Sequence, residues 1–297
     1  GSRGEICEMT TDFGGQNMYQ PLRRVLVKRP DETFAVQDPD RWNYLARPDL
    51  EAAQWEHDAM VETLRQSGAE VHDHDAPQPD RADAIYVYDP LLVTDHGAVV
   101  LSMGKDLRRG EEQALAQRLQ DLGIPTLFSL EGDARAESGD LLWLDESTLA
   151  AGIGFRTNQE GVTQLRAGLE PLGIDVLAFE LPYFTGPEAC LHLLSLISVL
   201  DRDLAVVYPP LMPVPFWMEI EARGFQLVVV PEVEFGTMGT NVLALGPRSC
   251  LVLEGNPRTR RGLEEAGCQV LSYRGQEISL KCEGGPTCLT RPLLRRA

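Results

Sequence analysis

One short pattern recurs five times in the 297-residue chain, and it constrains the fold more than any other feature. A segment of helical character ends at a glycine, and after two further residues a residue suited to a β-strand follows. The glycines are Gly68, Gly123, Gly173, Gly224 and Gly267, spaced 55, 50, 51 and 43 residues apart. Glycine at this place is the usual left-handed end of a helix. The recurrence predicts five similar units, each with a helix leading into a strand.

Helix starts and paired apolar runs complete these units. Asp49 is a predicted N-cap, Thr157 and Glu160 form a predicted capping box, and Asn256-Pro257 is suited to start a third helix. Apolar runs separated by turn residues predict hairpins. The paired runs are residues 91–93 with 98–101, 141–144 with 148–152, and 242–245 with 250–253.

The predicted fold class is therefore α/β, with five modules of mixed strands around a closed ring. An ordinary α/β protein with coincidental spacing is the alternative. No long linker interrupts the pattern, which predicts a single domain at residues 21–297. Residues 1–20 are expected to form a lead-in, in which residues 13–18 are a candidate lid.

Composition excludes several classes of partner. The formal net charge is −18, which argues against a general nucleic-acid binder and is compatible with a small cationic substrate. No apolar run approaches the ~20 residues needed to cross a bilayer, and the N-terminus lacks the apolar segment of a secretory signal. We expect a cytoplasmic protein with no nucleic-acid or membrane partner, and a homodimer as one candidate assembly.

Reactive side chains follow the glycine of each unit, and in a ring of modules such positions converge on the axis. In chain order they are Asp83 and Asp89, Glu137, His192, Asn241 and Cys288. A cysteine, a histidine and a carboxylate are the parts of an activated nucleophile. Cys288 follows a Gly-Gly-Pro-Thr turn, and we expect Glu137 to orient and polarise His192.

The other cysteines and histidines give weaker signals. Cys190, Cys250 and Cys268 lie in apolar runs and are predicted to be buried and inert. No group of residues predicts a metal site, and no cofactor is expected.

Three motifs together resemble the guanidine-modifying enzymes of the pentein fold. They are residues 137–140 (Glu-Ser-Gly-Asp), His192-Leu193, and residues 284–288 (Gly-Gly-Pro-Thr-Cys). The resemblance covers about residues 21–294 and implies a five-bladed αβ propeller with pseudo-fivefold symmetry and its site on the axis. Within this superfamily, the sequence is most similar to dimethylarginine dimethylaminohydrolases.

The resemblance also implies a set of substrate contacts. Asp83 and Asp89 are similar to an aspartate pair that contacts the substrate, and Asp140 belongs to the same substrate-binding set. Arg108 and Arg156 correspond to arginines that hold the substrate carboxylate.

Three positions depart from the patterns of these relatives. Ser138 replaces a glycine, and Tyr88 stands where dimethylarginine enzymes often carry glutamate. Leu194 stands where arginine deiminases and amidinotransferases typically have aspartate, which argues against those two activities.

The implied reaction hydrolyses a C–N bond of a guanidino group without a cofactor. Cys288 would form a covalent thiouronium, and the expected conversion is Nω-methylated L-arginine to L-citrulline plus methylamine or dimethylamine. The alternatives within the superfamily are an arginine deiminase, an arginine dihydrolase and an amidinotransferase. A non-catalytic binding protein on the same frame and an unrelated cysteine peptidase are more distant alternatives.

Overall fold

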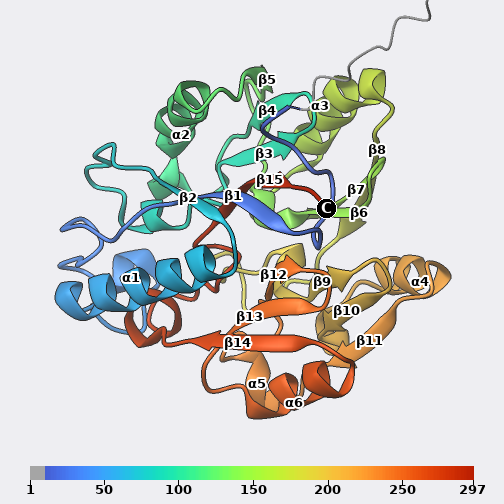
Figure 1. Cartoon of the computed structure of the whole chain (residues 1–297). Coiled ribbons are helices and arrows are strands. Elements are labelled where there is room, and N and C mark those ends of the chain that lie inside the picture. The colour runs from blue at the N-terminus through green and yellow to red at the C-terminus, as the bar shows by residue number, and fades with distance from the viewer. Residues whose placement is uncertain (1–10) are drawn as a thin grey trace, which may run out of the picture.

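A computed structural model describes residues 11–297, and residues 1–10 of the expected lead-in lie outside the described part. Five small sheets form the body, and helices pack outside them (Figure 1). The helices are α1 (Leu50–Gln66), α2 (Glu111–Asp121), α3 (Gln159–Leu169), α4 (Val214–Ala222), α5 (Glu232–Phe235) and α6 (Pro257–Glu265).

Each sheet has three strands with one common topology. An antiparallel pair comes first, a helix follows, and the third strand pairs in parallel with the middle one. Four of the sheets are β3 (Leu91–Thr94), β4 (Gly97–Val100) and β5 (Thr126–Ser129); β6 (Leu141–Asp145), β7 (Thr148–Ile153) and β8 (Asp175–Glu180); β9 (Ile197–Asp201), β10 (Leu204–Val207) and β11 (Gln226–Val229); and β12 (Leu243–Gly246), β13 (Ser249–Leu253) and β14 (Gln269–Tyr273). The five predicted units and the three predicted hairpins are confirmed.

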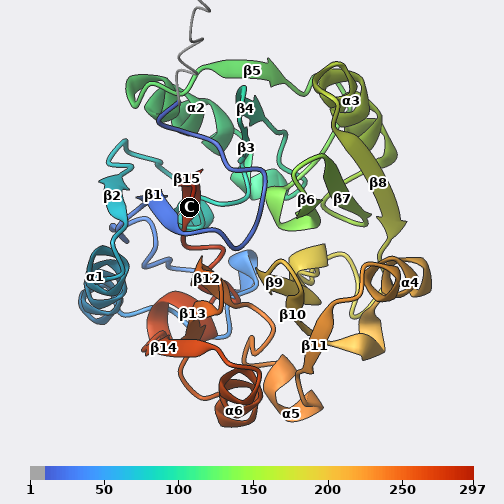
Figure 2. The ribbon, with the colours of Figure 1, turned by 45° about the vertical axis from the view of Figure 1, so that its right-hand side comes forward.

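The remaining sheet joins the two ends of the described chain. It consists of β15 (Arg291–Arg295), β1 (Leu22–Val27) and β2 (Glu70–Asp73), in that order, with β15 antiparallel to β1. Figure 2 shows this sheet and the other four arranged around a common centre, with the helices at the periphery. The architecture is a mixed α/β fold.

The five repeated glycines end their helices as predicted. Their φ angles are all positive, between 73° at Gly224 and 95° at Gly68. A Cβ atom at any of them would meet no heavy atom within 4 Å, so conformation rather than space favours glycine there.

Two of the three predicted helix starts are confirmed. The Asp49 side chain accepts a hydrogen bond from the Ala52 N–H and caps α1, and Pro257 is the first residue of α6. The prediction for Thr157 is wrong, because Asn158 caps α3 and accepts from the Gly161 N–H instead. The Thr157 hydroxyl is used elsewhere, near the predicted site.

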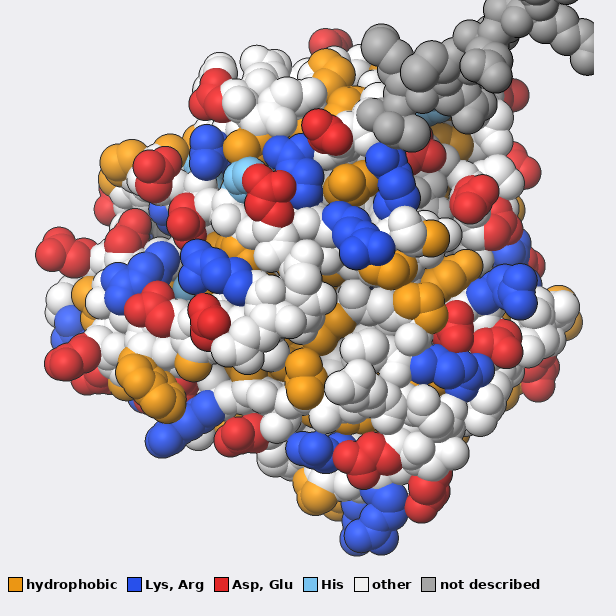
Figure 3. Space-filling view, viewed as in Figure 1, with side chains coloured by type: hydrophobic (Ala, Val, Ile, Leu, Met, Phe, Trp, Pro, Cys, Tyr) orange, Lys and Arg blue, Asp and Glu red, His pale blue; other side chains and the backbone are white. Residues whose placement is uncertain are grey.

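The hydrophobic core lies between the sheets and the helices outside them. On α3, for example, Val162, Leu165 and Leu169 are fully buried in one cluster with Val176 of β8. Figure 3 shows acidic and basic side chains interspersed on one face of the molecule rather than a continuous basic surface. Within residues 11–297, no helix has the length and apolar character that a membrane-spanning segment requires.

Candidate active site

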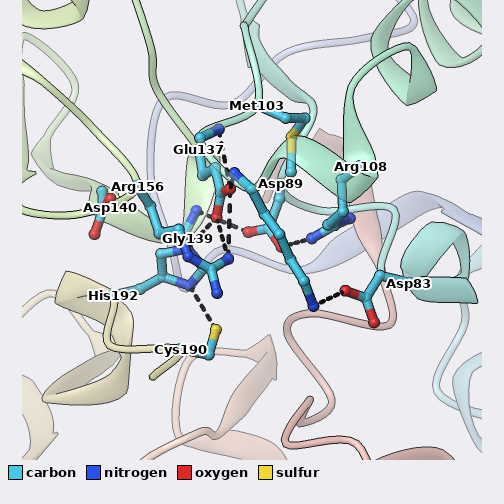
Figure 4. Close-up of polar contacts among 12 residues, drawn as sticks. Asp83, Asp89, Met103, Arg108, Glu137, Gly139, Asp140, Arg156, Cys190 and His192 are labelled. Carbon is cyan, nitrogen blue, oxygen red and sulfur yellow. Dashed lines mark hydrogen bonds and ion pairs between the residues drawn. The ribbon is translucent and has the colours of Figure 1, made fainter. Parts of the chain in front are cut away.

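A cleft of about 440 Å³, open solvent at its mouth included, is lined by loops from several of the sheets. Its lining brings together six of the side chains predicted from the sequence: Asp83, Asp89, Arg108, Arg156, His192 and Cys288. Glu137 is not part of the lining but lies next to His192, as Figure 4 shows. Residues up to 205 positions apart in the chain therefore meet at one site, from Asp83 to Cys288.

The pair formed by Glu137 and His192 is held rigidly. Glu137 Oε2 lies 2.6 Å from His192 Nε2, and Glu137 Oε1 accepts from the backbone N–H groups of Gly104 and Lys105 at 3.1 and 3.0 Å. Burial opposes ionisation of this carboxyl, but the Arg156 guanidinium and the His192 hydrogen bond outweigh it and hold the pKa of Glu137 well below its usual range. An ionised Glu137 fixes the imidazole by accepting from Nε2.

The other ring nitrogen of His192 faces Cys190, which is predicted from the sequence to be buried and inert. Cys190 Sγ lies 3.7 Å from His192 Nδ1, and Cys190 lines the cleft at intermediate burial. The prediction that Cys190 is buried is wrong, because its apolar run ends in a loop that lines the cleft. Burial lowers the pKa of His192, but the charges of Cys190, Asp140 and Asp89 outweigh it, and the net pKa is raised. The imidazole is therefore suited to donate a proton.

Cys288 is positioned by a residue of the fourth unit. Asn241 Nδ2 donates to Cys288 Sγ at 3.3 Å, and Asn241 Oδ1 accepts from the Thr287 N–H at 3.1 Å. A Cβ atom on Gly285 would lie 2.3 Å from Cγ of Asn241, so this contact requires glycine. Asn241, predicted only by its place in the array, thus orients the turn that carries the thiol.

Burial raises the pKa of the Cys288 thiol to about 12, with further raising contributions from Asp89 and Cys190. His192 and the Asn241 hydrogen bond lower it, but they do not cancel the effect of burial. Cys288 is therefore a neutral thiol in the ligand-free protein near pH 7, and an added cation in the cleft would favour its thiolate.

This pKa predicts slow alkylation of the free protein at neutral pH. Because only the thiolate reacts, the iodoacetamide rate at Cys288 should rise about tenfold per pH unit from pH 7 to 10. A bound, unreactive guanidinium compound too small to cover the sulfur should raise the rate at pH 7. Peptide mass spectrometry distinguishes Cys288 from Cys190, and a rate that levels off below pH 8 would contradict the prediction.

The carboxylate of Asp89 is held by two groups that leave it facing the cleft. Arg108 Nη1 donates to Asp89 Oδ2 at 2.7 Å, and the Gly139 N–H donates to Asp89 Oδ1 at 3.1 Å. Arg108 is itself 3% exposed, and its Nε and Nη2 donate to Glu111 while Nη2 also donates to the Tyr86 carbonyl. Arg108 lines the cleft, and its Nε, Nη1 and Nη2 each donate to a protein acceptor, so its contact with a substrate carboxylate stays a prediction.

Asp83 is also engaged by neighbours that sequence reasoning missed. Its two oxygens accept from the Tyr44 hydroxyl at 2.7 Å and from Lys105 Nζ at 2.6 Å. Lys105 lines the cleft and lies over the Trp42 ring, 5.3 Å from its centroid. The only available signal was the location of Lys105 just after β4, three residues before Arg108.

Asp140 is held by neighbours outside the cleft. It is fully buried and does not line the cleft, and its oxygens accept from the Thr157 hydroxyl at 2.7 Å and from the Leu193 N–H at 3.0 Å. Asp140 therefore fastens the loop that carries His192, and its contact with substrate stays a prediction. A Cβ atom on Gly139 would lie 2.5 Å from His192 Nδ1, so glycine makes room for the imidazole.

Arg156 retains donors that face the cleft. It is 7% exposed, and within residues 11–297 its side chain donates only to Glu137, from Nη1 at 3.2 Å to Oε2. The Nε and Nη2 groups remain free for an anionic group of a ligand. Arg156 is thus the cleft arginine best suited to bind a carboxylate.

Three side chains of the site could in principle hold a metal ion. Single ligand atoms of Asp89, Glu137 and His192 lie within 4.8 Å of one another. However, Arg108 pairs with Asp89, and Arg156 pairs with Glu137. Two guanidinium groups among the ligands make this arrangement unfavourable for a further cation.

The candidate lid at residues 13–18 lies away from this cleft. Gly14 forms a β-bridge with Leu294, and Gly14, Gly15, Asn17 and Met18 line a separate cavity. The exposed residues of the cleft lining come instead from other loops: Asn43, Glu188 and Glu283.

Similar proteins of known family establish the class of enzyme and the family to which this chain belongs. A sequence model described as N,N dimethylarginine dimethylhydrolase, eukaryotic, matches residues 40–295. The N(G),N(G)-dimethylarginine dimethylaminohydrolase of Streptomyces coelicolor is 30% identical over 273 residues, covering 91% of this chain and 94% of the relative. The protein is a hydrolase of guanidino groups, an enzyme of the class that cleaves linear amidines. It belongs to the dimethylarginine dimethylhydrolase family.

More distant matches extend the comparison. One solved structure is of a dimethylarginine dimethylaminohydrolase from Pseudomonas aeruginosa, a cysteine-to-serine variant in complex with citrulline. It aligns with this chain with a TM-score of 0.76. The alignment covers 91% of this chain and 99% of that one, and at 22% identity it shows the shared fold. An arginine deiminase of Streptococcus gordonii is 26% identical over 206 residues, which span 49% of its length.

Proposed function

We propose that the protein hydrolyses Nω-methylated L-arginine to L-citrulline and methylamine or dimethylamine through a covalent intermediate on Cys288. One observation carries the proposal: Cys288 lines the same cleft as His192, which Glu137 orients, and as the carboxylate of Asp89. Membership of the family supports the choice of substrate.

Asp89 would bind the substrate's guanidinium. The group is planar and cationic, and charge-assisted hydrogen bonds to a buried carboxylate hold such a cation in one orientation. Arg108 and the Gly139 N–H keep Asp89 fixed, so little reorganisation is required on binding. The arriving cation also offsets the negative charge that raises the pKa of Cys288, so substrate binding favours the thiolate that attacks it.

The reaction would then follow from the positions of sulfur and imidazole. The Cys288 thiolate adds to the central guanidinium carbon, and His192 donates a proton to the departing amine, which leaves poorly as an anion. The C–N bond breaks, and a thiouronium remains on the enzyme. His192, now neutral, takes a proton from water, which attacks the same carbon and releases citrulline and the thiol.

Two differences from arginine deiminases favour a methylated guanidinium over an unsubstituted one as the substrate group. Leu194, in the place where deiminases carry aspartate, is 6% exposed and does not line the cleft. Near His192, the cleft presents the polarisable thiol of Cys190 instead of a further carboxylate. A methylated nitrogen donates fewer hydrogen bonds and gains from contact with sulfur.

Arg156→Ala should raise KM for methylarginine at least about tenfold, because a charge-assisted contact present before and during reaction is lost. A decarboxylated analogue, methylated agmatine, isolates this contact, and its KM should be the same in variant and wild type. Arg109→Ala is the matched control, because Arg109 is exposed and pairs with Asp106 outside the cleft. An equal rise in KM for both substrates would place the carboxylate elsewhere.

A product assay tests the proposed substrate. Citrulline and released amine or ammonia are measured with asymmetric dimethylarginine, monomethylarginine and arginine, and the highest kcat/KM is expected for a methylated arginine. A preference for arginine would favour the deiminase reaction, and ornithine as product would favour the dihydrolase. Transfer of the amidino group to an added amine, with no hydrolysis, would replace the proposal by an amidinotransferase.

We further propose that the five sheets form a closed pseudo-fivefold propeller within one domain at residues 21–297. The antiparallel pairing of β15 with β1 supports this, because the last strand completes the sheet begun by the first. Strand β12 also contacts β1 and β9, which belong to the two neighbouring sheets, so these three sheets are joined around the ring.

A further inference from the structure

A second cavity lies next to the turn that carries Cys288 and shares no lining residue with the catalytic cleft. The empty space in and around it amounts to about 540 Å³, open solvent included. Thr287 and Tyr88, the chain neighbours of Cys288 and Asp89, belong to its lining. Figure 2 shows the segment that precedes β1 curving beside the end of β15, where this cavity lies.

Two buried arginines line this cavity without a carboxylate partner. The structure contains four buried arginines among its described residues, and two of them, Arg108 and Arg156, form ion pairs with acidic side chains. The other two, Arg291 and Arg295, are each 5% exposed and form no ion pair within residues 11–297. A buried charge without a counter-ion is unfavourable unless something else compensates it.

Protein carbonyls compensate these charges only in part. Arg291 Nη1 donates to the carbonyls of Tyr88 and Leu91 and to the Ser138 hydroxyl, and Nε donates to the Pro292 carbonyl. The Arg291 guanidinium lies 4.1 Å from the centroid of the Tyr88 ring. Arg295 Nη1 donates to the Gln20 carbonyl. Within the described chain, Nη2 of Arg291 and both Nε and Nη2 of Arg295 have no hydrogen-bond acceptor. Burial, with a smaller contribution from the neighbouring Arg291, lowers the pKa of Arg295 to about 10, although Tyr88 opposes this shift.

Asn17 is a third residue of this lining with a free hydrogen-bond donor. Asn17 Oδ1 accepts from the backbone N–H groups of Tyr19 and Gln20 at 3.2 and 2.8 Å, which leaves the Asn17 amide NH₂ as a donor. Asn17 lines the cavity and is 8% exposed. The polar part of the lining is therefore rich in donors, and the remainder includes apolar side chains such as Met18, Trp143 and Val199.

We propose that this cavity binds a small inorganic anion, with chloride as the probe, between the guanidinium groups of Arg291 and Arg295. The anion supplies the missing counter-charge and accepts from donors that the protein leaves unused. Its site adjoins the active centre, because Tyr88 N–H donates to the Cys288 carbonyl at 3.3 Å and Arg291 holds the Tyr88 carbonyl. Anion binding therefore stabilises the fold close to the turn that carries the thiol.

Thermal unfolding of the full chain tests binding. At constant ionic strength and pH 7, replacing sodium gluconate, whose anion is too bulky for a compact site, with sodium chloride should raise Tm saturably by about 3 °C. Arg295→Met should abolish this difference, whereas Arg261→Met, which removes the same charge from the exposed face of α6, should retain it. Equal Tm values in the two salts for the wild type would overturn the proposal, as would an undiminished difference in Arg295→Met.

Bromide localises the site without relying on a variant. Crystals of the wild-type protein soaked in sodium bromide should give an anomalous peak within hydrogen-bond distance of both guanidinium groups. Absence of this peak at a bromide concentration that saturates the Tm effect would overturn the proposal. Parallel titrations with phosphate and acetate separate a site for small halides from one for oxyanions, and a Tm rise confined to the oxyanions would overturn the assignment to a halide-sized ligand.

Discussion

A Cys288→Ser variant should lose at least about 10³-fold in kcat and still bind substrate. Serine fills nearly the same space, so Asn241 and the turn remain in place, but a hydroxyl is a far weaker nucleophile than a thiolate. Citrulline production measures the loss, and isothermal calorimetry with methylarginine measures the retained affinity. In the wild type, mass spectrometry of an acid-quenched reaction should detect the thiouronium on the peptide that contains Cys288.

Cys190→Ser is the matched control, because it makes the same change in the same cleft. Cys190 contacts His192 Nδ1 but is held by no residue comparable to Asn241. We expect kcat within about tenfold of wild type, with a shift in its pH dependence because Cys190 contributes to the raised pKa of His192. Loss of turnover in Cys190→Ser with retention in Cys288→Ser would reverse the assignment of the nucleophile.

The repeat predicted the fold well because it reports a local backbone requirement. Each of the five helix-ending glycines adopts a positive φ, as at Gly173 with 74° and Gly267 with 88°, and this conformation is encoded within a few residues. Hairpin positions such as residues 141–152 follow from the same local alternation of apolar runs and turns. The joining of β15 to β1 depends instead on contacts across the whole chain, and no local pattern encodes it.

The array of reactive residues predicts the cleft side chains and the pairing of Glu137 with His192, but not the other partners of these residues. Arg108 lines the same cleft as Cys288 and His192. It also donates to Glu111, only three residues further along the chain. That choice depends on which acceptors lie nearby after folding, so residue type alone cannot predict it. Likewise, Thr157 suits a helix cap, but the Asp140 carboxylate competes for its hydroxyl and leaves the cap to Asn158.

Replacing His192 with glutamine should lower kcat with dimethylarginine by about 10²- to 10⁴-fold, because the amine then leaves without a proton donor. The 2.6 Å contact with Glu137 and the raised pKa of His192 are the basis for this role. His96→Gln, at an exposed turn between β3 and β4, is the matched control and should keep wild-type activity.

A change of leaving group separates the two tasks of His192. S-methyl-L-thiocitrulline would form the same thiouronium with Cys288, but it expels methanethiol, which departs as a thiolate more readily than an amine departs as an anion. In His192→Gln we therefore expect a burst of methanethiol equal to the enzyme concentration, followed by slow citrulline release, because no base remains to activate water. If methanethiol and citrulline instead appear together at one slow rate, formation of the intermediate is the slow step in the variant. The proposal that His192 serves the first step only by protonating the departing amine would then be wrong. The burst distinguishes a lost proton donor from a misplaced thiol, since a displaced Cys288 would slow attack on both substrates equally.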